Sequence, residues 1–367
     1  MIHQFMVWWS LWALALPVSV PVWRLQLVTS VRPPESSATA LGTVTGLALL
    51  PDGSVYVAER SSARVSLYGR DGALMRVMMR AGEGPGETRE PEIAASGDTL
   101  IVYDGALDRL SRLSASGHVL EERRLSAGAV GSLFAARNGT LFHRISMASS
   151  AGGILVDRRG RVDTMRWQHP RTEDLSILWN GPNWDLVGRS PYSPLGVVAF
   201  DPLGRVVVGG SRRSRWFVIV GSDTVQTVGL PDVPVVIPPR VRDSVWQAWY
   251  ASLPTNKLPH LADVVIESRI PKTLPPWVSF DIDAENQWWI GRPGLTGVLA
   301  SWDIASNGRI VGHLAVPAPV VDRWPTGPIM TFANGRVAML HEDLDGVPWV
   351  GVYRVLPGAS MSAKRNR

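Results

Sequence analysis

The sequence contains no cysteine, and only three of its 37 basic residues are lysines, namely Lys257, Lys272 and Lys364. The lack of cysteine excludes disulfides, thiol chemistry, cysteine-ligated zinc, iron–sulfur clusters and lipid attachment through an N-terminal cysteine. The net charge is +5, but the basic residues are scattered along the chain. Because a surface that follows phosphates gathers its charges in one place, we expect no nucleic-acid partner.

Segments with a helical period are scarce, whereas short apolar runs of Val, Ile, Leu and Tyr are frequent. Such runs are typical of β-strands. The 35 glycines and 28 prolines suit a fold with many tight turns. The chain, at 367 residues, is long enough for one large all-β domain.

The first residues, Met1 to Leu16, are apolar and include no Lys, Arg, Asp or Glu. This run is too short to span a bilayer but suits the apolar region of a signal peptide, and Ala13-Leu14-Ala15 offers a cleavage site. We therefore expect residues 1–22 to be a signal peptide and lead-in. The mature protein is then periplasmic or extracellular and has no stable membrane span. Since basic residues are lacking before the apolar run, a membrane-associated N-terminus stays open as the alternative.

A unit of four strands recurs along the chain, with Gly-containing turns between its strands. In the first copy the strands are Thr43–Leu49, Val55–Val57, Arg64–Tyr68 and Leu74–Met78. The sixth copy stops after three strands, while Trp23–Val28 is a strand without a partner of its own. Joining the two completes a sheet and closes a ring, which leaves only short, protected edges.

The repeats therefore predict an all-β, six-bladed β-propeller over residues 23–357, whose N-terminal strand closes the last blade. We expect a disordered tail at 358–367. Two long insertions, 168–194 and 230–275, interrupt the repeats. The second contains one short helix over Val241–Leu253, since Pro238-Pro239 precedes apolar residues at helical spacing.

The segment Arg80-Ala81-Gly82-Glu83-Gly84-Pro85-Gly86-Glu87 follows the first copy. It resembles the R-x-G-x-G-P-G-E signature of bacterial six-bladed propellers related to the NHL and TolB-like proteins. The Leu274-Pro275-Pro276-Trp277 segment is also similar to that group. The resemblance implies an exported propeller more than it implies an activity. We interpret the octapeptide as a shaped crossover, with Gly82, Gly84 and Gly86 at positive φ and Pro85 stiffening the turn.

In a four-stranded blade, the turns between second and third strands lie on the same face as the blade-to-blade connections. Both insertions and the octapeptide therefore extend one rim, which is the usual place for a binding site. The ligand-binding candidates on that rim are Glu59, Asp104, Arg212, Arg213, Arg292, His341 and Glu342.

Two functions remain open at this stage. The first is a binding or interaction module whose ligand, an unknown small molecule, peptide or protein, lies on the insertion-bearing face. Arginines on that rim favour an anionic or polar ligand. The alternative is a metal-dependent hydrolase or lyase of the lactonase or NHL type, because His143 and His341 lie on opposed blades. The sequence assigns no catalytic residue, and we expect no cofactor, with calcium or zinc at the channel mouth left open.

Overall fold

The structure, a computed structural model, describes most of the chain between residues 20 and 358. The described residues are 20–33, 40–124, 133–135, 141–146, 151–156, 162–167, 176–181, 184–189, 196–210, 214–220, 223–231, 234–252, 271–295, 299–316, 322–323 and 327–358. The predicted signal peptide up to residue 19 and the predicted tail from 359 onward lie outside them.

The described chain is built almost wholly of antiparallel strands that follow one another as meanders. The first strands are β1 (Arg24–Val31), β2 (Val44–Leu49), β3 (Val55–Glu59), β4 (Arg64–Tyr68), β5 (Leu74–Ala81), β6 (Glu87–Thr88), β7 (Pro91–Ser96), β8 (Thr99–Asp104), β9 (Arg109–Leu113) and β10 (Val119–Arg124). The middle strands are β11 (Leu133–Ala135), β12 (Leu141–Ser146), β13 (Ala151–Val156), β14 (Val162–Trp167), β15 (Ser176–Gly181), β16 (Trp184–Arg189), β17 (Gly196–Phe200), β18 (Val206–Gly210), β19 (Arg215–Val220) and β20 (Asp223–Gly229). The last elements are α1 (Pro239–Ser252), β21 (Ser279–Ile282), β22 (Trp288–Pro293), β23 (Leu299–Ser306), β24 (Arg309–Ala315), β25 (Asp322–Arg323), β26 (Gly327–Pro328), β27 (Met330–Ala333), β28 (Arg336–Glu342) and β29 (Pro348–Leu356).

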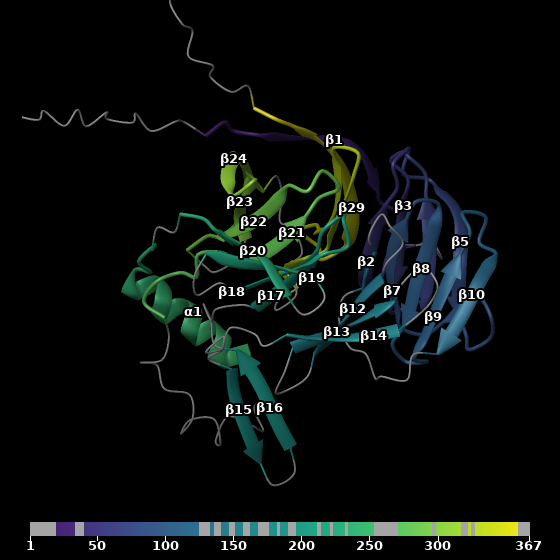
Figure 1. Ribbon diagram of the computed structural model, residues 1–367, viewed down its shortest axis with the longest axis horizontal. Coiled ribbons are helices and arrows are strands. Elements are labelled where there is room, and N and C mark those ends of the chain that lie inside the picture. The colour runs from purple at the N-terminus through teal and green to yellow at the C-terminus, as the bar shows by residue number, and fades with distance from the viewer. Residues whose placement is uncertain are drawn as a thin grey trace, which may run out of the picture.

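These strands form a β-propeller with one short helix (Figure 1). Five sheets have four strands each, where the sequence predicted six such sheets; they are β7–β10, β11–β14, β17–β20, β21–β24 and the sheet of β1 with β27–β29. The sheet that begins with β2 differs because it has a fifth strand, β6. Strand β6 belongs to the octapeptide crossover and pairs in parallel with the end of β5. Two further pairs, β15–β16 and β25–β26, stand apart from these sheets.

The innermost strands of the sheets are β2, β7, β11, β17, β21 and β27, and they contact one another in chain order. Strand β27 contacts β2, β2 contacts β7, β7 contacts β11, β11 contacts β17, and β17 contacts β21. Strand β21 in turn contacts β26, which immediately precedes β27. The inner strands therefore follow one another around a ring, as a propeller requires.

The N-terminal segment closes the ring, as the sequence predicted. Strand β1 pairs antiparallel with β29, from Arg24 opposite Leu356 to Val31 opposite Val350. Just before β1, the amide of Trp23 donates to the carbonyl oxygen of His313 (2.7 Å), and the amide of His313 donates to Pro21 (3.0 Å). One segment thus joins the outer edge of the β21–β24 sheet to the outer edge of the last sheet.

Two asparagine–glycine turns show why the predicted repeats fold as hairpins. Asn307-Gly308 and Asn334-Gly335 have positive φ at both residues, between 46° and 74°. Both positions of a type I′ turn need this conformation, and Asn and Gly adopt it at the lowest cost. The turns therefore set the registers of β23 with β24 and of β27 with β28.

The two predicted insertions both contain regular structure. Strands β15 and β16 form a hairpin inside residues 168–194. In residues 230–275 the predicted helix is present as α1, which begins two residues earlier than expected, at Pro239. The base of this insertion is a short ladder, because Ile237 donates to Lys272 (2.9 Å) and Leu274 donates to Val235 (2.9 Å).

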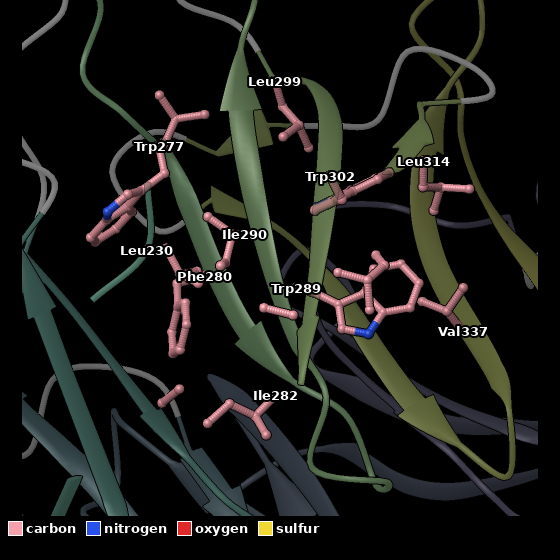
Figure 2. Packing of buried hydrophobic residues seen from close by; sticks show 14 of the residues in the cluster. Leu230, Trp277, Phe280, Ile282, Trp289, Ile290, Leu299, Trp302, Leu314 and Val337 are labelled. Carbon is pink, nitrogen blue, oxygen red and sulfur yellow. The ribbon is translucent and has the colours of Figure 1, made fainter. Parts of the chain in front are cut away.

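The core near the insertion is rich in aromatic residues (Figure 2). Trp216 and Trp277 are fully buried and stack with ring centroids 5.6 Å apart. On the opposite side of the β21–β24 sheet, the Trp289 ring contacts Trp302 and Phe332. Full burial of a large apolar side chain contributes about 1.5–3 kcal/mol, so these residues hold the β21–β24 sheet between its two neighbours.

Candidate functional site

The turns between second and third strands lie on the same rim as the crossovers that enter each sheet, as the sequence predicted. The amide of Arg60, after β3, donates to Thr43, just before β2 (2.8 Å). The amide of Gly105, after β8, likewise donates to Glu90, just before β7 (3.2 Å). Each of these turns is therefore fastened to the crossover that leads into its own sheet.

Glu59, a predicted ligand-binding residue, is buried at the end of β3 and fastens this rim. Its Oε2 accepts hydrogen bonds from Nε and Nη2 of Arg64, at 2.9 and 2.6 Å. Its Oε1 accepts one from the amide of Gly42 (2.9 Å). Both carboxylate oxygens are thus taken by donors of the chain itself, and charge-assisted hydrogen bonds of this kind are strong.

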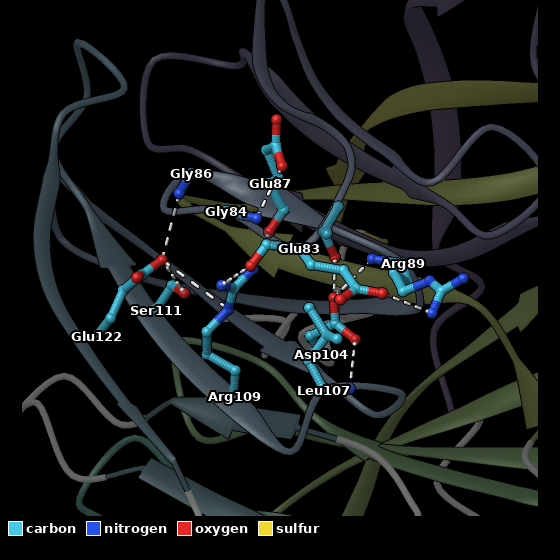
Figure 3. A network of polar contacts seen from close by, with 11 residues as sticks. Glu83, Gly84, Gly86, Glu87, Arg89, Asp104, Leu107, Arg109, Ser111 and Glu122 are labelled. Atoms are coloured by element: carbon cyan, nitrogen blue, oxygen red, sulfur yellow. Dashed lines mark hydrogen bonds and ion pairs between the residues drawn. The ribbon is translucent and has the colours of Figure 1, made fainter.

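Asp104, the corresponding residue of β8, makes a still denser set of contacts (Figure 3). Its Oδ2 accepts from the Thr88 hydroxyl (2.7 Å) and the Arg89 amide (2.6 Å). Its Oδ1 accepts from the amides of Ala106 and Leu107, at 3.0 and 3.1 Å. The carboxylate therefore joins its own turn to the end of the octapeptide crossover.

Each of these acids has an arginine opposite it at the start of the next strand. Arg64 is the register partner of Glu59, and Arg109 is the register partner of Asp104. Arg109 donates to the carbonyl oxygens of Glu83 (2.9 Å) and Glu87, inside the octapeptide (Figure 3). We call this pairing of an acid and an arginine on one crossover a crossover clamp.

The octapeptide is a shaped crossover, and its glycines differ from one another. Gly82 and Gly86 have φ of 153° and 74°, as predicted, but Gly84 is not among the residues with positive φ. The Gly84 amide donates a hydrogen bond to Oε2 of Glu87 (2.7 Å), which closes the turn. Glycine is favoured at position 82 because side chains rarely adopt its φ, and a Cβ there would also lie 2.0 Å from the same Glu87 oxygen.

Arg292, a third predicted candidate, is part of a similar clamp. Here the arginine lies on the second strand of the sheet and the acid, Asp303, on the third, the reverse of the other two clamps. Its guanidinium donates to Oδ2 of Asp303 (2.6 Å) and to the carbonyl oxygen of Pro276, which enters this sheet. Oδ1 of Asp303 contacts Nδ1 of His313. The Asp303 side chain is 8% exposed and the His313 side chain 47% exposed, so a buried carboxylate orients a half-exposed imidazole.

Sequence reasoning missed Asp303 and His313. The two residues face each other only because β23 and β24 pair with Asp303 opposite His313. Their spacing along the chain matches no catalytic or metal-binding motif. The hairpin turn at Asn307-Gly308 was the one signal that could have placed them together.

Two further predicted candidates, His341 and Glu342 on β28, take no part in these clamps. His341 is fully buried, stacks on Trp349 with centroids 4.3 Å apart, and its Nε2 lies 2.9 Å from the hydroxyl of Tyr353. Burial raises the pKa of that tyrosine to about 12. Glu342 is exposed at the end of β28. Arg212 and Arg213 lie outside the described residues, as do the side chain of His143 and that of Trp249.

A further acid, Asp281 on the innermost strand β21, was not predicted as a candidate. Burial raises its pKa to about 7, the hydrogen bond from the amide of Ile282 lowers it, and the nearby charge of Asp283 raises it. Asp283 lies in the turn after β21, and burial raises its pKa to about 6 against hydrogen bonds from Trp289 and Gln287. A carboxyl group with a raised pKa on an inner strand is a candidate for function.

Within the described ranges, no three His, Asp or Glu side chains come close enough together to hold a metal ion. Two of the predicted rim acids, Glu59 and Asp104, lie in separate clamps, each in its own sheet. In the same ranges, α1 is too short and too polar to cross a bilayer, and no other helix could do so.

Comparisons with known proteins support the fold and leave the ligand open. No family model and no curated sequence matches the chain. The solved structure of a Bacteroides fragilis protein titled "Putative exported protein" is similar over 91% of this chain and 95% of that one, with 11% identity and a TM-score of 0.50. Virginiamycin B lyase from Staphylococcus aureus (10% identity, TM-score 0.43, 90% and 88% of the chains) is also similar. So is the calcium-binding protein regucalcin from Agrobacterium tumefaciens (12%, 0.44, 93% and 99%).

The class of protein is therefore a β-propeller with a helical insertion between β20 and β21. At these identities the likeness to solved structures concerns the fold alone. What the protein binds has to be argued from its own residues.

Proposed function

We propose that this protein is an exported six-bladed propeller, with the five-stranded sheet counted as one blade, and that it acts as a binding module. Its ligand is an acidic peptide or polymer, recognised on the insertion-bearing face. Export is supported by the apolar run from Met1 to Leu16, which has the length of a signal-peptide core.

The observation that carries this proposal is the way the insertion is rooted. The ladder between Val235–Ile237 and Lys272–Leu274 ties its two ends together. Arg292 donates a hydrogen bond to the carbonyl oxygen of Pro276, which lies two residues after Leu274. Loops held at the base by a rigid scaffold are the usual carriers of recognition.

Two exposed basic residues at the base of the insertion favour an anionic ligand. Arg240 and Lys272 are exposed at its base, whereas Arg242 contacts Asp243 (3.7 Å). Val235 and Val236, beside Lys272, are 47% and 69% exposed. An acidic chain with some apolar residues complements such a surface. Arg292, which the sequence suggested for this role, is instead neutralised by Asp303.

The rim acids favour a binding module over the metal-dependent hydrolase. In the hydrolase alternative, Glu59 and Asp104 would supply oxygen ligands at the channel mouth. Every oxygen of these two carboxylates already accepts a hydrogen bond from the chain. Metal binding would therefore have to break the clamps that fasten the crossovers.

Binding of fluorescent poly-L-glutamate, measured by anisotropy at low salt, tests the proposal. The double variant Arg240→Glu/Lys272→Glu should bind at least about tenfold more weakly than the unchanged protein, because two attractive charges become repulsive. The matched control Arg124→Glu/Arg354→Glu makes the same change of charge at exposed strand positions away from the insertion and should bind normally. Equal losses in both variants, or no binding at all, would refute the proposal.

A second assay addresses the hydrolase directly. The purified protein is incubated with a panel of lactones and added calcium or zinc, together with the Glu59→Gln variant. Metal-dependent turnover that disappears in Glu59→Gln at an unchanged melting temperature would establish the alternative instead.

A further inference from the structure

The imidazole of His313 is held at one ring nitrogen and is open to solvent on its other side. Its Nδ1 contacts Oδ1 of Asp303, and this is the only hydrogen bond or ion pair that the ring makes in the part of the chain that the structure describes. The Asp303 side chain is buried, whereas that of His313 is 47% exposed. Because Nδ1 is turned toward the buried carboxylate, the exposed side of the ring is the one that carries Nε2.

The contact with Asp303 fixes which ring nitrogen carries the proton. Oδ2 of Asp303 accepts a hydrogen bond from Nε of Arg292 (2.6 Å), and an arginine side chain stays charged in proteins. A carboxylate in such an ion pair accepts hydrogen bonds and donates none. Nδ1 of His313 is therefore the donor, and Nε2 keeps its lone pair, which is directed away from Asp303.

The backbone of His313 is fastened on both sides. On one side β24 pairs with β23, where Asp303 is the register partner of His313. On the other side the amide of His313 donates to Pro21 (3.0 Å), and its carbonyl oxygen accepts from the amide of Trp23 (2.7 Å). Ala315, the next residue on the same face of β24, is exposed and small. A small molecule can therefore approach an imidazole that is fixed in position.

We propose that His313 is the nucleophile of an acyl-transfer site for activated acyl esters, such as aryl esters, and that Asp303 is its positioning residue. Nε2 attacks the carbonyl carbon of the ester, the bond to the aryl oxygen breaks, and an aryl oxide leaves. The acyl-imidazolium that results carries a positive charge, which the Asp303 carboxylate stabilises. Water then cleaves the bond between Nε2 and the acyl carbon, which releases a carboxylic acid, and the ring returns the added proton to solvent.

This site goes beyond the binding function proposed above, because it carries out a reaction and lies on β23 and β24 rather than on the insertion. Its steps use only the imidazole, the carboxylate and water. A chelator should therefore leave the reaction unchanged, which separates it from the metal-dependent hydrolase.

His118 provides a comparison within the same chain. It is exposed in the turn between β9 and β10, where its backbone amide donates to the hydroxyl of Ser114 (3.1 Å). Among the described residues no acid contacts its ring. Because nothing holds the His118 ring in one tautomer, its Nε2 carries a lone pair for only part of the time. His313 should therefore react faster than His118 with the same reagent, although both are exposed.

Labelling with diethyl pyrocarbonate, followed by peptide mass spectrometry, compares the two histidines in one sample. At about pH 8, where an ordinary imidazole is neutral, His313 should be labelled at least about fivefold faster than His118. Asp303→Asn should abolish this difference. Since Arg292 still requires an acceptor, the amide oxygen of the new side chain faces Arg292 and its NH2 group faces Nδ1, which moves the ring proton to Nε2.

Turnover is measured as p-nitrophenolate release from p-nitrophenyl acetate in the presence of EDTA. His313→Gln and Asp303→Asn should each lower the rate at least about threefold, with the remainder due to other nucleophiles of the chain. The matched control His118→Gln should leave the rate nearly unchanged.

Nitrogen-15 NMR of the histidine rings separates positioning from a loss of fold. His313 should show the Nδ1–H tautomer in the unchanged protein and the Nε2–H tautomer in Asp303→Asn. If Asp303→Asn does not fold, the tautomer in the unchanged protein and the labelling ratio of the two histidines still decide the matter. An Nε2–H tautomer in the unchanged protein, equal labelling of His313 and His118, or p-nitrophenolate release unaffected by His313→Gln overturns the proposal, and none of these results bears on poly-L-glutamate binding.

Discussion

Removal of the Trp23 side chain should open the propeller at its closure. Trp23 is 7% exposed and belongs to the core cluster around Trp302 and Leu314. Its ring also covers Gly312, since a Cβ there would lie 2.3 Å from the indole Nε1. Replacing a buried Trp by Ala costs about 3–5 kcal/mol. We expect Trp23→Ala to lose about this much, a large share of the 5–15 kcal/mol that typically stabilises a folded domain.

Urea unfolding followed by circular dichroism measures this loss. The matched control is Leu27→Ala on β1, where the side chain is 52% exposed, and it should change the stability by less than about 0.5 kcal/mol. Gly312→Ala should also destabilise, because its methyl group displaces the indole. In the double variant Trp23→Ala/Gly312→Ala the two losses should not add, since the methyl group then finds space. A loss below about 1 kcal/mol in Trp23→Ala, or additive losses in the double variant, would refute this account of the closure.

Three other predictions concern the clamp, the inner acid and the octapeptide. Asp104→Ala should lower the free energy of unfolding by about 3 kcal/mol or more in urea, since it strands several buried donors; a loss under 1 kcal/mol would contradict the clamp. Because the folded-state pKa of Asp281 is raised from 3.8 to about 7, its ionisation lowers stability as pH rises from about 4 to about 7. Asp281→Asn should therefore gain stability over the unchanged protein across that window, by at most about 4 kcal/mol and by about half of that after allowance for solvent, and a gap independent of pH would argue against it. Gly82→Ala should destabilise by about 1–3 kcal/mol, more than Gly97→Ala, which also has a positive φ (58°) but where a Cβ meets nothing within 4 Å; equal melting temperatures would refute the steric argument.

Local patterns predicted most of the fold. The strand at Trp23–Val28 had no partner of its own, and the last repeat lacked one strand. The pairing of β1 with the last sheet could therefore be predicted by counting the strands of each repeat. Asn334-Gly335 and Asn307-Gly308 predicted hairpins because their backbone preferences are intrinsic. The parallel pairing of β6 could not be predicted in this way, because it depends on how the octapeptide folds back onto β5.

The roles of the charged residues were harder to predict from the sequence. Glu59 and Asp104 were correctly placed on the rim, but their partners include the backbone amides of Gly42 and Arg89. Backbone donors carry no sequence signal, so a ligand-binding acid and a clamp acid look alike in the sequence. Asp281 was overlooked because a single acid within a strand matches no motif, and the burial that raises its pKa depends on the folded chain.

The crossover clamps fasten the sheets that begin with β2 and β7 from within. Glu59 with Arg64, and Asp104 with Arg109, hold the segment that leads into their own sheet, so the charges needed to lock a blade come from within that blade and its lead-in. Neighbouring blades then meet chiefly through apolar faces, which tolerate substitution as long as volume is kept. A blade of this kind could be duplicated, exchanged or lengthened at its tips with no matching change in the charges of its neighbours. That modularity leaves residues 168–194 and 230–275 free to vary in length and sequence while the ring beneath them stays closed.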